Sequence, residues 1–138
     1  MLVDGRGVPL SILVTGANVP DCTKLDELLG NRVAEPFGEE AGRENLCLDA
    51  GYRGKGPVAE KHGYRPHIQS RWEEREEKKG GANGGRKARR WVVEASHSWF
   101  NRFRKLVPRY EKTDLSFMGL LQLAAALIAF NKVMVIYG

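Results

Sequence analysis

The amino-acid sequence predicts an α/β fold, and three observations support this prediction. Apolar and polar residues alternate over 8–14, as in a β-strand, and a second apolar run over 46–49 ends at a carboxylate. Turns rich in glycine and proline separate these strands from short helical patterns. Two longer helical patterns, at 88–106 and 114–132, close the chain. Strands interleaved with helices and followed by helices are typical of α/β proteins, and a chain of 138 residues suits one domain.

The first ten residues predict a hairpin. Gly5-Arg6-Gly7 has the composition of a tight turn, so residues 1–3 are expected to end a strand that pairs with 8–14. Asp4 is interpreted as a residue of this turn. Because the chain opens inside a strand, we expect that one or more N-terminal strands of the sheet are missing.

Short helices are predicted on either side of the second strand. Before this strand, the spacing of Leu25, Leu28 and Leu29 predicts a helix that follows Pro20 and ends at Gly30. Pro57 is placed to open another short helix, and Gly63 to end it. A further strand is expected at 64–69, although its proline weakens that pattern.

Composition excludes several classes of protein. The two cysteines, Cys22 and Cys47, are too few for a disulfide framework, and Cys47 is expected to be buried in its apolar strand. The opening residues lack a signal-peptide core. The longest apolar stretch, 120–130, is interrupted by Gln122 and is too short for a membrane span. It predicts a buried terminal helix in a cytoplasmic protein.

Charge is unevenly distributed along the chain. The net charge is +5, yet residues 1–85 sum to −2, residues 86–112 to +7 and residues 113–138 to zero. A concentrated basic segment is expected of a protein that binds a polyanion, although a solvated basic face explains it equally well. The charged, glycine-rich stretch at about 70–88 has little to bury and is predicted to be a mobile insertion.

Asp49 is the first candidate for chemistry. It ends the apolar run 46–49 and precedes glycines that let the backbone turn sharply. Active sites of open α/β sheets lie at the carboxyl ends of strands. Capping of the turn and ligation of a metal are both open for Asp49 from these residues alone.

Glu94 is the second candidate, on the predicted helix 88–106. One stripe of this helix is apolar and faces the core: Val92, Ala95, Trp99, Phe103 and Leu106. A second stripe is polar: Arg90, Glu94, His97, Asn101 and Arg104 or Lys105. Glu94 could form salt bridges along the helix, worth about 0.3–0.5 kcal/mol each. Alternatively it is a metal ligand flanked by cations that contact phosphates.

Four strings follow one another between positions 49 and 112. They are Asp49-Ala50-Gly51-Tyr52-Arg53-Gly54, Arg90-Trp91-Val92-Val93-Glu94, Ser98-Trp99-Phe100-Asn101-Arg102-Phe103-Arg104-Lys105-Leu106 and Arg109-Tyr110-Glu111-Lys112. Together with the segments at 3–10 and 15–21, they resemble the C-terminal half of bacterial insertion-sequence transposases of the DDE type. The resemblance extends over nearly the whole chain.

This resemblance implies a partial ribonuclease-H-like fold, with an incomplete sheet and C-terminal helices, over residues 1–138. It implies DNA transposition by metal-dependent phosphoryl transfer, in which three acidic residues hold Mg²⁺ or Mn²⁺ for strand cleavage and strand transfer. Asp49 matches the second of these acidic residues and Glu94 the third. The residues expected to contact DNA are Arg53, Arg89, Arg90, Arg102, Arg104 and Lys105.

The sequence departs from the family pattern at several positions. The first acidic residue has no counterpart, because Asp4 matches a turn residue. Asn101 stands where the family signature has lysine, and Lys87 stands where it has tyrosine. We therefore expect the product of a truncated or split-frame gene that begins at an internal Met1 and is inactive alone.

The resemblance also indicates partners and a location. Double-stranded DNA is expected as partner, both transposon ends and target, together with the upstream transposase fragment or a second copy of the chain. A non-catalytic DNA-binding fragment that associates with or inhibits a full-length transposase is the alternative function. A third hypothesis is an unrelated metal-dependent nuclease of the same fold. The expected location is the bacterial cytoplasm, at the nucleoid and away from membranes.

Overall fold

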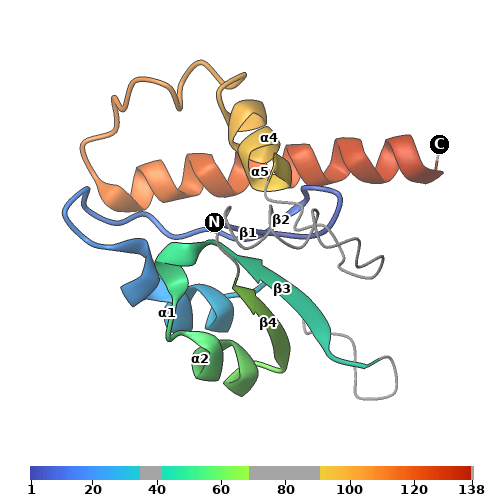
Figure 1. The fold of residues 1–138 in the computed structure, drawn as a ribbon. Coiled ribbons are helices and arrows are strands. Elements are labelled where there is room, and N and C mark those ends of the chain that lie inside the picture. Colours follow the sequence, from blue (N-terminus) through green and yellow to red (C-terminus); the bar gives the residue numbers. More distant parts are fainter. Residues whose placement is uncertain (35–41, 69–90, 138) are drawn as a thin grey trace. The chain divides into compact units, whose positions relative to one another are not determined.

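The computed structural model describes residues 1–34, 42–68 and 91–137, and the chain divides into two compact units (Figure 1). The first unit contains Met1–Val19, Asn31–Ala34 and the chain from Trp91 onward. The second contains Pro20–Gly30 and the chain from position 35 to position 90. The predicted insertion at 70–88, together with Arg89 and Arg90, lies outside the described residues.

The first unit opens with the predicted hairpin. Strand β1 (Leu2–Val3) pairs in antiparallel fashion with β2 (Pro9–Ser11), and the register is irregular between the two residues of β1. The Asp4 carboxylate accepts hydrogen bonds from the backbone amides of Arg6 and Val8, both at 2.8 Å. The hairpin and the turn role of Asp4 are confirmed, but β2 is shorter than the predicted strand at 8–14.

Helix α4 (Trp91–Phe100) is also shorter than predicted. The expected helix continued to position 106, whereas the backbone after Phe100 forms successive turns. Its amide hydrogen bonds reach back three residues instead of four, from Phe103 to the Phe100 carbonyl and from Leu106 to the Phe103 carbonyl. In these tighter turns Phe103 and Leu106 still pack against the unit's core, so tertiary packing outweighs the helical pattern.

Helix α5 (Asp114–Tyr137) completes the first unit. The Thr113 hydroxyl accepts a hydrogen bond from the Ser116 amide at 3.2 Å and so caps the first turn. Phe100 of α4 packs with Ala124 and Ile128 of α5 in a buried cluster. Partly buried side chains from the hairpin, the turns and both helices surround it: Met1, Ile12, Trp99, Phe103, Leu106, Leu121 and Ala125.

The prediction that the terminal helix is buried is wrong for most of α5. Only 11% of the most apolar 18-residue window within Asp114–Val135 is buried, and Leu123 and Phe130 are exposed. With a mean hydropathy of 1.7 in that window, the segment Asp114–Val135 is long and apolar enough to cross a membrane by length and composition. It is the one such helix among the described residues. Among the described residues, the hairpin, α4 and the turns that follow α4 pack against one side of α5.

The second unit is a β–α–β arrangement preceded by helical turns. The turn η1 (Asp21–Lys24) leads into α1 (Leu25–Gly30), as the leucine pattern predicted. Strands β3 (Glu44–Leu48) and β4 (Tyr64–Ile68) are parallel and joined through η3 (Ala50–Tyr52) and α2 (Gly56–Lys61). The buried apolar residues are Leu25, Leu29, Leu46, Ala59 and Tyr64.

Cys47 is exposed, contrary to the prediction. Side chains alternate between the two faces of a strand, and Leu46 occupies the buried face of β3. Its neighbour Cys47 must therefore point the other way. The mixed α/β class, the two small sheets and the C-terminal helices agree with the fold class that the sequence predicts.

Candidate functional site

Asp49 lies immediately after the carboxyl end of β3, where the sequence analysis expected it. Its carboxylate oxygen Oδ1 accepts a hydrogen bond from the Gly51 amide at 2.9 Å and caps η3. The side chain is exposed. A carboxylate has two oxygens and about four acceptor positions. Capping of the turn and ligation of a cation are therefore compatible roles for Asp49.

Backbone hydrogen bonds between residues three apart in sequence stabilise the turn after Asp49. The Tyr52 amide donates to the Asp49 carbonyl at 3.1 Å, and the Lys55 amide donates to the Tyr52 carbonyl at 3.0 Å. Gly54 has a φ of +81°, a conformation that an L side chain rarely adopts. The turn thereby presents Arg53, which is exposed, close to Asp49 in sequence.

Burial and nearby acidic groups both shift the pKa of the Tyr52 hydroxyl in this turn. Burial of the side chain raises the pKa of Tyr52 above its ordinary value of 10.0, and the nearby charges of Asp21, Asp49 and Cys22 raise it further. These groups all belong to the second unit. The carboxylates of Asp21 and Asp49 therefore both lie close enough to influence the Tyr52 hydroxyl.

Glu94 lies in the first turn of α4 and is exposed. Val92 and Ser96 are buried, so they hold the helix by one side while Glu94 faces solvent from another. A carboxylate near a helix N-terminus is stabilised by the unpaired amides there, typically by about 0.3–1 kcal/mol. Glu94 thus offers carboxylate oxygens on a helix anchored to the core.

The anchor of α4 is a residue that the sequence analysis missed. The buried hydroxyl of Ser96 lies 2.9 Å from the Gly7 carbonyl oxygen in the hairpin turn and 2.9 Å from the Val92 carbonyl oxygen. The predicted apolar stripe passed through Ala95 and Trp99 instead. A polar residue such as Ser96 does not contribute to a pattern of apolar residues. Its role becomes visible only through its contact with Gly7, which is distant in sequence.

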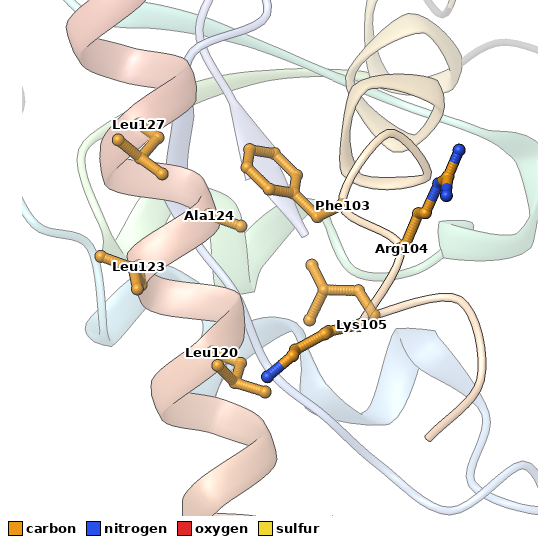
Figure 2. Close-up of a pocket in the computed structure, with 8 residues that line it drawn as sticks. Phe103, Arg104, Lys105, Leu120, Leu123, Ala124 and Leu127 are labelled. Atoms are coloured by element: carbon orange, nitrogen blue, oxygen red, sulfur yellow. The ribbon is translucent and has the colours of Figure 1, made fainter. Parts of the chain in front are cut away.

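Arg102, Arg104 and Lys105 do not extend the polar stripe of Glu94, because α4 ends before them. They are exposed in the turns that follow. Figure 2 shows Arg104 pointing away from α5, while Lys105 reaches toward Leu120 of that helix. The three cations form an exposed basic turn, here defined as residues 102–105. Its chemistry suits contact with phosphate groups.

The two candidate carboxylates belong to different units, Asp49 to the second and Glu94 to the first. Within residues 1–34, 42–68 and 91–137, no group of three or more His, Cys, Asp and Glu side chains is arranged to hold a metal ion. Carboxylate oxygens are the donors that Mg²⁺ and Mn²⁺ prefer. Asp49 and Glu94 therefore fit a divalent cation in donor type.

Comparison with known proteins agrees with the resemblance to DDE transposases that the sequence motifs indicate. Residues 46–131 match the family model described as "Transposase DDE domain", and this match includes both carboxylates. No solved structure matches the chain.

A curated relative from Burkholderia cepacia is named "Putative transposase for insertion sequence element IS402". The chain is 30% identical to it over 138 residues, which cover 95% of this chain and 61% of that protein. The chain thus spans about three fifths of its relative's length. Because the family model matches more than half of the chain, the chain belongs to the DDE-domain transposases of insertion sequences.

Proposed function

We propose that this chain takes part in DNA transposition, by metal-dependent cleavage and transfer of DNA strands. The observation that carries this proposal is the position of Asp49 at the carboxyl end of β3, inside the family match. Divalent metal ions, when bound, activate a water or a 3′-hydroxyl for attack and stabilise the leaving oxygen. Asp49 and Glu94 would supply carboxylate ligands for these ions.

The fold proposed for the complete catalytic domain is ribonuclease-H-like. The described residues contain two sheets of two strands each, and a two-stranded sheet is at best marginally stable alone. Further strands would extend such sheets through their unpaired edges. We propose that polypeptide outside these 138 residues supplies those strands and the first acidic residue, which the chain lacks in the family pattern.

DNA is the proposed partner, bound through the exposed basic turn and through Arg53. Arg89 and Arg90, outside the described residues, are proposed as further contacts on sequence grounds. Arg104 is exposed and points away from α5, so its guanidinium is accessible to a phosphate (Figure 2). The uneven charge along the chain supports a polyanionic partner, since 86–112 carries a net charge of +7.

A salt titration tests the DNA contacts. Affinity for a labelled duplex should fall linearly with the logarithm of salt concentration, with a slope of about −0.9 per neutralised phosphate. Arg104→Ala should reduce that slope by roughly one contact. Lys24→Ala is the control, because Lys24 is paired with Glu27 at 2.7 Å and lies in the other unit. An affinity that does not change with salt would contradict the DNA contacts.

Calorimetry with Mn²⁺ and Mg²⁺ tests the metal ligands. Asp49→Asn and Glu94→Gln should each weaken binding, whereas Glu60→Gln, an exposed carboxylate on α2, should not. Unchanged metal affinity in both site variants would exclude the assigned ligands.

Nicking of supercoiled DNA in the presence of the upstream part of a transposase tests the activity. Cleavage that depends on Glu94 supports catalysis. DNA binding without cleavage under these conditions would leave the non-catalytic binding function as the better description.

A further inference from the structure

One face of the β3–β4 sheet is exposed and polar, although parallel sheets are usually covered by apolar layers on both faces. Helices α1 and α2 lie on the other side of the two strands, where Leu46 and Tyr64 are buried (Figure 1). The exposed side, here called the polar face, carries four side chains: Asn45, Cys47, Arg65 and His67. None of the four is a large apolar residue, so this face suits a polar partner.

The register of the two strands brings hydrogen-bond donors together on the polar face. Asn45 is the partner of Arg65, and Cys47 is the partner of His67. The Asn45 oxygen Oδ1 lies 2.7 Å from Nε2 of His67. A carboxamide oxygen can only accept, so the His67 ring donates to it and the NH₂ group of Asn45 keeps its two donors. Arg65 adds a guanidinium with five N–H donors beside that group.

The charge of the polar face is complementary to a phosphate. Arg65 is exposed, and none of the four side chains of this face is acidic. Arg43, exposed just before β3, adds a second cation near the amino end of that strand. A guanidinium can donate two parallel hydrogen bonds to one phosphate, and such charged pairs are stronger than neutral ones. A third phosphate oxygen can accept from the amide of Asn45.

The polar face leads to Asp49. Because β3 and β4 are parallel, both strands end at the same edge of the sheet. Asp49 follows β3 with an extended backbone, φ −78° and ψ 174°, and lies two residues beyond Cys47 on the same side of the strand. Asn45 is four residues before Asp49, or about 13 Å along an extended strand. Phosphates of one DNA strand rise by about 3.4 Å each, so this distance corresponds to about four nucleotides.

We propose that Arg65 and Asn45 bind a phosphate of DNA about four nucleotides away from Asp49. His67 is a positioning residue, because its hydrogen bond orients Asn45. This inference rests on the proposed function, since it takes DNA to be the substrate. It adds a contact to those at Arg53 and in the basic turn, and it directs the bound strand toward the carboxylate of Asp49.

Fluorescence anisotropy of a labelled duplex, measured with the full chain, tests the contact at Arg65. Arg65→Gln should lower the affinity about fivefold or more at low salt and reduce the salt slope by about 0.9, the value of one phosphate contact. Lys24→Gln is the matched control, since it removes the same charge from the helical side of the same unit, where Lys24 pairs with Glu27. Circular dichroism verifies that both variants are folded. Equal affinities of the two variants would overturn the proposal.

Conservative substitution tests the positioning role of His67. Asn45→Ala and His67→Ala should weaken binding of the duplex to a similar degree. His67→Gln should recover part of the affinity, because its amide can still donate to Asn45. A His67→Gln variant that binds as weakly as His67→Ala would remove the positioning role.

The thiol of Cys47 reports directly on occupation of the polar face. Cys22→Ser leaves Cys47 as the single cysteine of the chain. A saturating duplex should slow its alkylation by iodoacetamide at least about fivefold, because the reaction requires an accessible thiol. Arg65→Gln should abolish this protection. Inorganic phosphate at the same concentration of phosphate groups should not protect Cys47, and equal protection by both would indicate a site for small anions instead of a DNA contact.

The outcomes separate this inference from the proposed function. A chain that binds the duplex and responds to Arg104→Ala, but neither responds to Arg65→Gln nor protects Cys47, would refute the inference and leave the proposed function standing. A chain that binds no duplex at any salt concentration would refute both.

Discussion

The hydroxyl of Ser96 lies 2.9 Å from the carbonyl oxygen of Gly7, although 89 residues separate them. This contact joins α4 to the turn of the β1–β2 hairpin and is fully buried on the serine side. Glu94 stands two residues before Ser96 on the same helix. The direction in which Glu94 faces solvent therefore depends on a glycine turn at the opposite end of the chain.

Gly7→Ala should destabilise the first unit by about 1–3 kcal/mol. Gly7 has a φ of +86°, and an added Cβ would lie 2.8 Å from the Ser96 hydroxyl and 2.9 Å from the Trp99 ring. Urea unfolding measures the change. Gly5→Ala in the same turn is the control, because a Cβ there meets nothing within 4 Å. Equal stabilities of the two variants would show that the close approach of α4 does not matter.

Ser96→Ala should cost about 1–2 kcal/mol, because it removes a buried hydrogen bond and leaves the Gly7 carbonyl without that donor. Ser98→Ala removes an exposed hydroxyl that bonds within the helix, to the Ala95 carbonyl at 2.7 Å, and should change stability little. Chemical denaturation of both variants checks the difference. A larger loss in Ser98→Ala than in Ser96→Ala would contradict the anchoring role of Ser96.

Substitutions of Asp49 should separate its structural role from its proposed metal role. Asp49→Asn keeps an oxygen that can accept from the Gly51 amide, so we expect stability close to the original but weaker metal binding. Asp49→Ala removes the cap as well and should lose about 0.5–1 kcal/mol. Thermal unfolding and metal titration of both variants give the comparison. Equal metal affinity of Asp49→Asn and the original chain would leave Asp49 with capping alone.

Asp26 should make the contact between α1 and α2 sensitive to acid. Hydrogen bonds from His62, at 2.8 Å, and from Lys61 hold the pKa of Asp26 below its ordinary value of 3.8. A lowered pKa in the folded state means that Asp26 stabilises the fold above the unfolded-state pKa. That contribution is lost as the pH falls through the lower, folded-state pKa.

The original chain should therefore be more stable than Asp26→Asn at neutral pH, and this advantage should shrink as the pH falls below about 4 and vanish only below the folded-state pKa of Asp26. Unfolding curves across the acid range test this expectation. Glu27→Gln is the control, because Glu27 lies beside Asp26 on α1 but pairs with Lys24 of η1 instead of with α2. A constant difference between the original chain and Asp26→Asn at every pH would argue against the ionic contact.

Local features were predictable where the residues that determine a turn or a helix start are neighbours in sequence. The hairpin turn at Gly5-Arg6-Gly7, the turn role of Asp4 and the helix opened near Pro57 required only neighbouring residues. A strand was also expected at 64–69, despite its proline, and β4 occupies 64–68, but its parallel pairing with β3 was not predicted. Errors arose where distant contacts decide: helix α4 stops at Phe100 because Phe103 and Leu106 reach the core through turns instead.

Sequence by itself determined the α/β class, the order of the elements and the family, because periodicity and motif strings are local properties of the chain. It also located Asp49 at a strand end and Glu94 on a helix. Tertiary structure alone decided that Ser96 is the buried anchor, that Cys47 is exposed and that most of α5 is uncovered. Burial depends on which surfaces meet, and residues such as Ser96 and Gly7 meet although they are 89 positions apart in the chain.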